Sequence, residues 1–82
     1  EEYIILKTPQ VSQASQVLEE KLNYPFKVIS ENQINIFGKN HHINEVNKTL
    51  LMSQIEIEEI HYFKQNLENY FTNLITTTEE ER

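Results

Sequence analysis

The sequence predicts a small α+β domain in which two helices cover one face of a four-stranded antiparallel sheet. Four short stretches alternate apolar and polar side chains with the period of a β-strand, and two longer stretches repeat apolar residues with the period of a helix. Turn residues separate these six segments in the order strand, helix, strand, strand, helix, strand. The 82 residues suffice for one such domain and are too few for two.

The first strand and the first helix are expected before residue 23. Residues 3–7 are apolar and β-branched, and the strand should stop at Thr8-Pro9. Thr8 is expected to cap the helix with Pro9 at its first position, where a missing N–H costs nothing. Apolar residues at helical spacing then carry the helix to about residue 22: Val11, Ala14, Leu18 and Leu22.

A hairpin is predicted next. Residues 23–25 break the helix at a proline, and residues 26–30 then alternate as a strand. The turn residues Glu31-Asn32 should reverse the chain, so that residues 33–37 pair back onto the preceding strand.

The second helix and the fourth strand follow the breaker Gly38-Lys39-Asn40. The helix should end near Ser53. A fourth strand is expected over residues 55–60, because Ile55 and Ile57 alternate with glutamates, and a change of phase predicts a bulge or strand end near Glu59. The apolar stripe of this helix is Ile43, Val46, Leu50 and Leu51.

A last helix is predicted from Asn66, which can cap it. Residues 76–82 should fray as an acidic tail, which leaves residues 1–75 as the single domain. The apolar positions of this helix are Leu67, Tyr70, Phe71 and Leu74.

The βαββαβ order closes most simply as a ferredoxin-like sandwich. One set of alternating residues should face the two helices: Ile4, Leu6, Phe26, Val28, Ile34, Ile36, Ile55 and Ile57. The opposite sheet face would carry Ile5, Ile29 and Phe37 among Lys7, Lys27, Gln33, Asn35 and Glu56. This is too much apolar surface to leave wholly wet, so we expect the last helix to cover part of it and a partner to cover the remainder.

Composition excludes several classes of chemistry. The chain has no Cys and no Asp, which rules out a Cys nucleophile and a Ser-His-Asp triad within it. His41 and His42 are adjacent, unlike a zinc-binding i, i+4 pair, and we expect them at the exposed start of a helix. His61 is interpreted as a surface or partner-contact residue, and Gly38-Lys39 as a turn without the other residues of a phosphate loop. We therefore predict no catalytic residue, cofactor or metal in this chain.

Charge and hydropathy constrain the partners. A net charge of −6 repels phosphate backbones, so we predict no nucleic-acid partner, although Tyr62, Phe63, Tyr70 and Phe71 are aromatic. No apolar run approaches the roughly 20 residues that span a bilayer, so no direct membrane insertion is expected. A small-ligand regulatory domain of the amino-acid-sensing type has the same element order, but the link Thr8-Pro9-Gln10 lacks the glycine usual near its ligand.

The C-terminal part of the sequence resembles a known family. Residues 66–74 (Asn-Leu-Glu-Asn-Tyr-Phe-Thr-Asn-Leu) are similar to the "SLED-hydrophobic-F-x-x-L" tail of many bacterial ATP-binding subunits of ABC exporters, including those for bacitracin, lantibiotics and other drugs. Asn66 stands where Ser is usual, and Asn69 where Asp is usual. Ile55, Ile57 and Ile60 precede this tail, and the likeness in pattern covers residues 3–75.

The resemblance implies a non-catalytic C-terminal accessory or regulatory domain of such a subunit, with ATP and magnesium bound elsewhere in the parent protein. Its partners would be the N-terminal ATPase domain of the same polypeptide, a second copy, or both, and indirectly a membrane permease. It would lie in the cytoplasm at the inner face of the membrane, in a transporter that exports a drug or peptide antibiotic and protects its producer. The alternative is a free-standing ferredoxin-like regulatory module that binds a small ligand or a partner protein. The residues expected to contact partners are Ile5, Ile29, Phe37, Leu67, Tyr70, Phe71 and Leu74.

Overall fold

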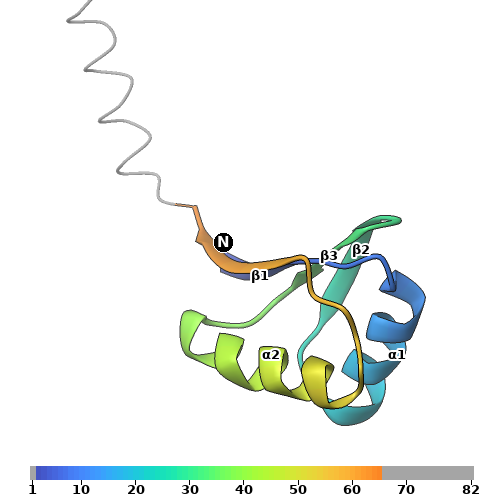
Figure 1. Ribbon diagram of the computed structural model, residues 1–82. Helices are drawn as coiled ribbons and strands as arrows, with labels where there is room; N and C mark the ends of the chain where they lie inside the picture. Colours follow the sequence, from blue (N-terminus) through green and yellow to red (C-terminus); the bar gives the residue numbers. More distant parts are fainter. Residues whose placement is uncertain (1, 66–82) are drawn as a thin grey trace, which may run out of the picture.

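The computed structural model describes residues 2–65, which form a four-stranded antiparallel sheet with two helices on one of its faces (Figure 1). Along the sheet the strands lie in the order β2-β3-β1-β4, and all neighbouring strands are antiparallel. This arrangement confirms the predicted α+β sandwich. The predicted last helix lies outside the described residues. The elements are β1 (Glu2–Lys7), α1 (Val11–Lys21), β2 (Phe26–Ser30), β3 (Gln33–Ile36), the 3-10 helix η1 (Asn40–His42), α2 (Ile43–Met52) and β4 (Glu59–Lys64).

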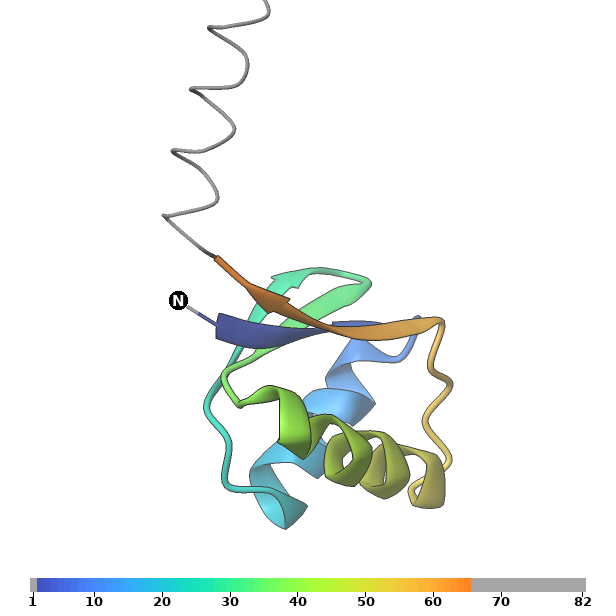
Figure 2. The same ribbon diagram turned by 90° about the vertical axis from the view of Figure 1, so that its left-hand side faces the viewer.

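The core lies between the sheet and the two helices, which pack on the same side of the sheet (Figure 2). The strands contribute the alternate residues, and the helices contribute residues three or four apart, as their two periods require. Each fully buried Ile or Leu side chain is worth about 1.5 to 3 kcal/mol relative to an exposed one. The buried apolar residues are Ile4, Leu6, Ala14, Leu18, Leu22, Ile34, Ile36, Val46, Leu50 and Ile55.

The start of α1 differs from the prediction. The helix begins at Val11 with Gln10 as its N-cap, so Pro9 precedes the helix instead of occupying its first position. Thr8 is fully buried, and its hydroxyl accepts a hydrogen bond from the Gln10 N–H at 3.0 Å. The Thr8 N–H itself donates to the Asn32 carbonyl at 3.0 Å. The threonine therefore orders the turn before the helix and is not its cap, because its hydroxyl accepts from the N–H of Gln10, which itself precedes the first helical residue.

The bounds of the fourth strand differ more from the prediction. β4 covers residues 59–64, whereas the sequence predicted residues 55–60. Ile55 follows α2 directly and closes the end of that helix, with its N–H 3.0 Å from the Leu50 carbonyl oxygen. Ile57 lies in the connection to β4, where it is half-buried against the core. The helix-facing places on the strand belong instead to Ile60 and Tyr62, which pair with Leu6 and Ile4, and Glu59 begins the strand.

The hairpin of β2 and β3 has the predicted turn and one irregularity. Val28 pairs with Ile34 and Ser30 pairs with Gln33, so Ile29 is the extra residue of a β-bulge. Val28 lies on the helix-facing side, as predicted, yet 48% of its surface is exposed because it sits on an edge strand.

Candidate functional site

The sheet face turned away from α1 and α2, here called the outer face, is the first candidate surface. No helix of the described residues covers it (Figure 2). Pairing places Ile5 between Asn35 and His61 at its centre. The predicted positions of Ile5, Lys7, Lys27, Gln33 and Asn35 on this face are confirmed by the same pairing. Glu56, also predicted here, lies in the connection before β4.

Three aromatic side chains gather at one end of the outer face. The Tyr3 ring lies between those of Phe63 and Phe37, with ring centroids 5.1 Å and 6.0 Å away. The Tyr3–Phe37 pair meets edge to face, a geometry that the charge distribution of aromatic rings favours. Phe63 is 39% exposed. We call Tyr3, Phe37 and Phe63 the aromatic cluster.

The other end of the outer face is charged. Lys7 Nζ lies 3.9 Å from Glu59 Oε1, and His61 Nδ1 lies 3.2 Å from Glu59 Oε2. All three side chains are about half exposed, so water screens these contacts and they contribute little to stability. The outer face therefore changes along its length from an aromatic end to a polar end.

Of the seven predicted partner-contact residues, Ile5 and Phe37 lie on the outer face and Phe37 belongs to the aromatic cluster. Ile29 is 46% exposed but lies at the bulge of β2, with β3 between it and β1. It is therefore not next to the other two. The remaining four, Leu67, Tyr70, Phe71 and Leu74, lie outside the described residues.

Sequence reasoning missed Tyr3 and Phe63 as members of the outer face. Tyr3 alternates with Ile4 at the start of β1, which was a usable signal. Phe63 could be assigned only with the correct bounds of β4, because a four-residue error in a strand changes which side chains belong to the sheet.

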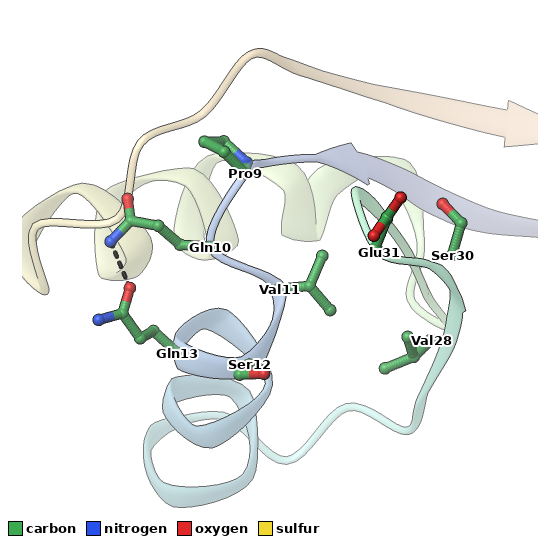
Figure 3. A pocket seen from close by; sticks show the side chains of 8 residues that line it. All are labelled: Pro9, Gln10, Val11, Ser12, Gln13, Val28, Ser30 and Glu31. Carbon is green, nitrogen blue, oxygen red and sulfur yellow. Dashed lines mark hydrogen bonds between the residues drawn. The ribbon is translucent and has the colours of Figure 1, made fainter.

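A second candidate surface is a shallow hollow of about 660 Å³ between the start of α1 and β2 (Figure 3). Val11 and Val28 lie on opposite walls, and Gln10 and Gln13 are joined by a hydrogen bond at its rim. The polar groups on its walls are amides, two hydroxyls and one carboxylate. The lining residues are Pro9, Gln10, Val11, Ser12, Gln13, Val28, Ser30 and Glu31.

The histidines at η1 have structural contacts. His42 Nδ1 accepts a hydrogen bond from the Lys39 N–H at 2.9 Å, and its ring lies 4.7 Å from that of Tyr24. The His41 and His42 rings are 4.1 Å apart. His41 is exposed, as predicted, but His42 is half-buried because it packs in the turn between Gly38 and α2. Over residues 2–65, no three His, Cys, Asp or Glu side chains gather closely enough to hold a metal ion.

Two tyrosines have altered acidity. The hydrogen bond from the Tyr24 hydroxyl to Glu45 raises the pKa of Tyr24, and burial and the negative charge of Glu45 add to this. Burial raises the pKa of Tyr62, helped by a hydrogen bond to Glu2 and by its charge. Both effects favour the neutral phenol.

Neither helix of the described residues is long and apolar enough to cross a membrane. In the structure α1 has 11 residues and α2 has 10.

Comparison with known proteins gives one informative result. No family model matches the chain, and no solved structure matches it. The chain is 35% identical over 75 residues to an uncharacterized ABC transporter ATP-binding protein, YcbN, of Bacillus subtilis (strain 168). The match covers 90% of this chain but 24% of that protein, so the chain spans about a quarter of its relative's length. The comparison supports the coarser part of the resemblance noted in the sequence, which is the similarity to ABC transporter ATP-binding proteins.

Proposed function

We propose that this chain is a non-catalytic accessory domain of an ABC transporter ATP-binding subunit, placed after the nucleotide-binding part. One observation carries the proposal: nearly the whole chain is similar to about a quarter of a protein described as an ABC transporter ATP-binding protein. In this proposal, ATP and magnesium bind to the rest of the parent protein, and this chain contributes contacts.

The outer face is the surface that suits such contacts best. It presents Ile5 and the aromatic cluster beside the polar group of Lys7, Glu59 and His61. Protein interfaces are enriched in aromatic residues and also contain polar contacts, and the two ends of the outer face offer both. The partner would be the ATPase domain of the same polypeptide or a second copy of this chain.

The contact would act on the conformational cycle of the transporter. Motor domains approach and separate as ATP is bound and hydrolysed, and a contact shifts this equilibrium only if it is stronger in one of the two states. The permease would be reached indirectly, through the ATPase, at the inner face of the membrane. The tail motif favours a drug or a peptide antibiotic as the exported substrate.

The test uses the full-length parent protein. The first step is to establish whether the reading frame around this chain encodes a P-loop ATPase, since its absence would end the proposal. The second is to compare ATPase rates of the parent, the Ile5→Thr variant on the outer face and the control Met52→Thr, which changes a 75% exposed side chain on α2. We expect a changed ATP dependence in Ile5→Thr alone. Equal rates in all three proteins would exclude the outer face as the contact.

The hollow beside α1 favours a second candidate function, a regulatory module that binds a small ligand. Its volume of about 660 Å³ falls within the range of about 300 to 1,000 Å³ usual for ligand pockets. Titration calorimetry of the isolated chain with free amino acids separates the two functions. Binding heat that disappears in Glu31→Gln would favour the ligand-binding module, and the absence of heat would favour the accessory domain.

A further inference from the structure

Strand β4, orange in Figure 2, lies at an edge of the sheet. Its residues pair with β1 in an unbroken register, from Glu59 with Lys7 to Lys64 with Glu2. Over residues 2–65, no strand pairs with β4 on its other side, because the order of the sheet is β2-β3-β1-β4. An edge strand carries a row of N–H and C=O groups that can pair with a strand of another chain.

The hydrogen bonds of β1 show which of its residues bond to β4. The Thr8 N–H donates to the Asn32 carbonyl oxygen at 3.0 Å, and this pair continues the register of β1 with β3. In an antiparallel sheet the backbone groups of successive residues point alternately to the two sides of a strand. The even-numbered residues of β1 therefore bond to β3, and Tyr3, Ile5 and Lys7 bond to β4.

The same alternation identifies the free backbone groups of β4. Its odd-numbered residues bond to β1, so Ile60, Tyr62 and Lys64 direct their N–H and C=O groups away from the sheet. Glu58, just before the strand, does not extend this row, because its N–H donates to the Lys7 carbonyl oxygen at 2.8 Å. The free edge therefore consists of the backbone groups of three alternate residues, with Tyr62 in the middle.

We infer that this edge pairs with β4 of a second copy of the chain, antiparallel and about a two-fold axis at Tyr62, so that the two sheets become one. The axis places Tyr62 opposite its own equivalent and Ile60 opposite Lys64 of the second copy. In this register every free N–H and C=O group of both edges is bonded. A shift that placed His61 at the axis would set Lys64 opposite Glu58, whose N–H is already used.

The side chains of β4 suit this register. Ile60 and Tyr62 are half-buried in the single chain, and a strand added beside them would cover more of their surface. Lys64 of the second copy can lay its apolar stem along Ile60 and keep its charge in water. On the outer face, each His61 would lie opposite Phe63 of the second copy, and aromatic pairs across strands are stabilising.

The charges of β4 permit self-association. Glu59 and Lys64 carry opposite charges, so the strand is close to neutral although the chain has a net charge of −6. The two Glu59 residues would lie about 20 Å apart along the strands, beyond the Debye length of about 8 Å at physiological salt. Of the features that usually protect an edge, β4 has a lysine only at its last residue, and it has no proline and no bulge.

Cysteine cross-linking tests the register, because the chain has no cysteine of its own. Positions 61 and 63 of the two copies would form a non-hydrogen-bonded pair with Cα atoms about 4.5 Å apart, within the range of about 4.4 to 6.8 Å that a disulfide spans. When 82-residue chains carrying His61→Cys and Phe63→Cys are mixed and mildly oxidised, we expect the mixed disulfide to form several-fold faster than that of His61→Cys with the control Leu51→Cys on α2. Equal rates would overturn the inference.

A proline on the edge tests the hydrogen bonds. Lys64→Pro removes an N–H that faces away from the sheet, so it breaks no bond between β4 and β1. Lys64→Ala is the matched control, since it removes the same side chain and keeps the N–H. In sedimentation velocity at a salt concentration that screens the net charge, we expect a reversible dimer of the 82-residue chain and of Lys64→Ala. The dissociation constant of Lys64→Pro should be at least about tenfold higher, with circular dichroism reporting whether it remains folded.

Two results of the sedimentation experiment would overturn the inference. A chain that is monomeric at every concentration would show that the edge of β4 does not pair with a second copy and is left to another part of the chain or to another protein. A dimer that Lys64→Pro leaves unchanged would use another surface, such as the outer face. Neither result bears on the proposed transporter function, because the experiment involves no ATPase.

Discussion

Ile55 donates its backbone N–H to the carbonyl oxygen of Leu50 at 3.0 Å, and both side chains are buried in the same core. Between them, Gln54 adopts a left-handed backbone with φ 64° and donates its N–H to the Leu51 carbonyl at 3.0 Å. This pair of bonds is the Schellman motif, which satisfies the last carbonyls of a helix. It terminates α2 and brings Ile55 into the core without a strand.

Replacing Gln54 by glycine should stabilise the protein. The left-handed conformation costs a residue with a Cβ about 1 to 2 kcal/mol, and glycine avoids this cost. Glycine loses more conformational entropy on folding, which offsets about 0.5 to 1 kcal/mol of the gain. We expect Gln54→Gly to raise the free energy of unfolding by about 0.5 to 1 kcal/mol in urea titrations. Gln54→Ala serves as the control and should change little, since it keeps the Cβ. A lower urea midpoint for Gln54→Gly would show that the glutamine side chain contributes more than its backbone costs.

Two neighbouring leucines of α2 should respond very differently to truncation. Leu50 is fully buried, whereas 55% of Leu51 is exposed. Leu50→Ala should lower the free energy of unfolding by about 2 to 5 kcal/mol, because it removes buried methyl groups and leaves a cavity. Leu51→Ala should stay within about 0.5 kcal/mol of the unsubstituted protein. Chemical denaturation of both variants tests this, and similar losses at the two positions would contradict the described packing of α2.

The hydroxyl group of Thr8 should contribute to the stability of the folded protein. Thr8→Val keeps the branched side chain but removes the acceptor of the Gln10 N–H, so that a donor in a partly buried turn loses its partner. Such a loss costs about 1 to 3 kcal/mol. Ser12→Ala, an exposed change one residue into α1, is the matched control and should be nearly neutral. Thermal melting of both variants gives the comparison, and an unchanged Tm in Thr8→Val would mean that water replaces the threonine oxygen.

Alkaline pH should destabilise the protein through two tyrosines. The pKa values of Tyr24 and Tyr62 are raised above the ordinary 10.0 in the folded state. The folded protein therefore holds these protons more tightly than the unfolded chain, and the resulting stability is complete below pH 10 and falls as the pH rises through the raised values. In urea titrations on both sides of pH 10, the double variant Tyr24→Phe/Tyr62→Phe should lose less stability than the unsubstituted protein. Equal losses would show that other groups cause the alkaline effect.

The sequence predicted the fold from its periodicities and failed where local hydrogen bonds decided the structure. Ile4, Leu6, Ile34 and Ile36 alternate within paired strands, so their pattern and their burial agree. Ile55 and Ile57 alternate in the same way, but the N–H of Ile55 bonds to the last turn of α2, so that Ile55 is part of the helix end and not of a strand. An alternating pattern alone does not distinguish a strand from a helix cap that happens to be followed by a second isoleucine.

The outer face was predicted only in part, because alternation within a strand assigns side chains to a face but does not show how the strands pair. Ile5 follows from β1 alone, because its neighbours Ile4 and Leu6 both face the helices. Ile29 could not be separated from it by sequence, since the bulge that displaces Ile29 depends on how Ser30 pairs with Gln33. The contact of Tyr3 with Phe63 depends on the register between the two ends of the described chain, which no local pattern encodes.

The bulge in β2 also limits how the molecule can assemble. Growth of a fibre by strand addition requires two joining edges on every molecule. Over residues 2–65 the pairing of β4 is regular through all six of its positions, while that of β2 is interrupted at Ile29. Within the described residues the sheet therefore has one regular edge strand, β4, and one irregular edge strand, β2, which is the less suited of the two to pair with a strand of another molecule.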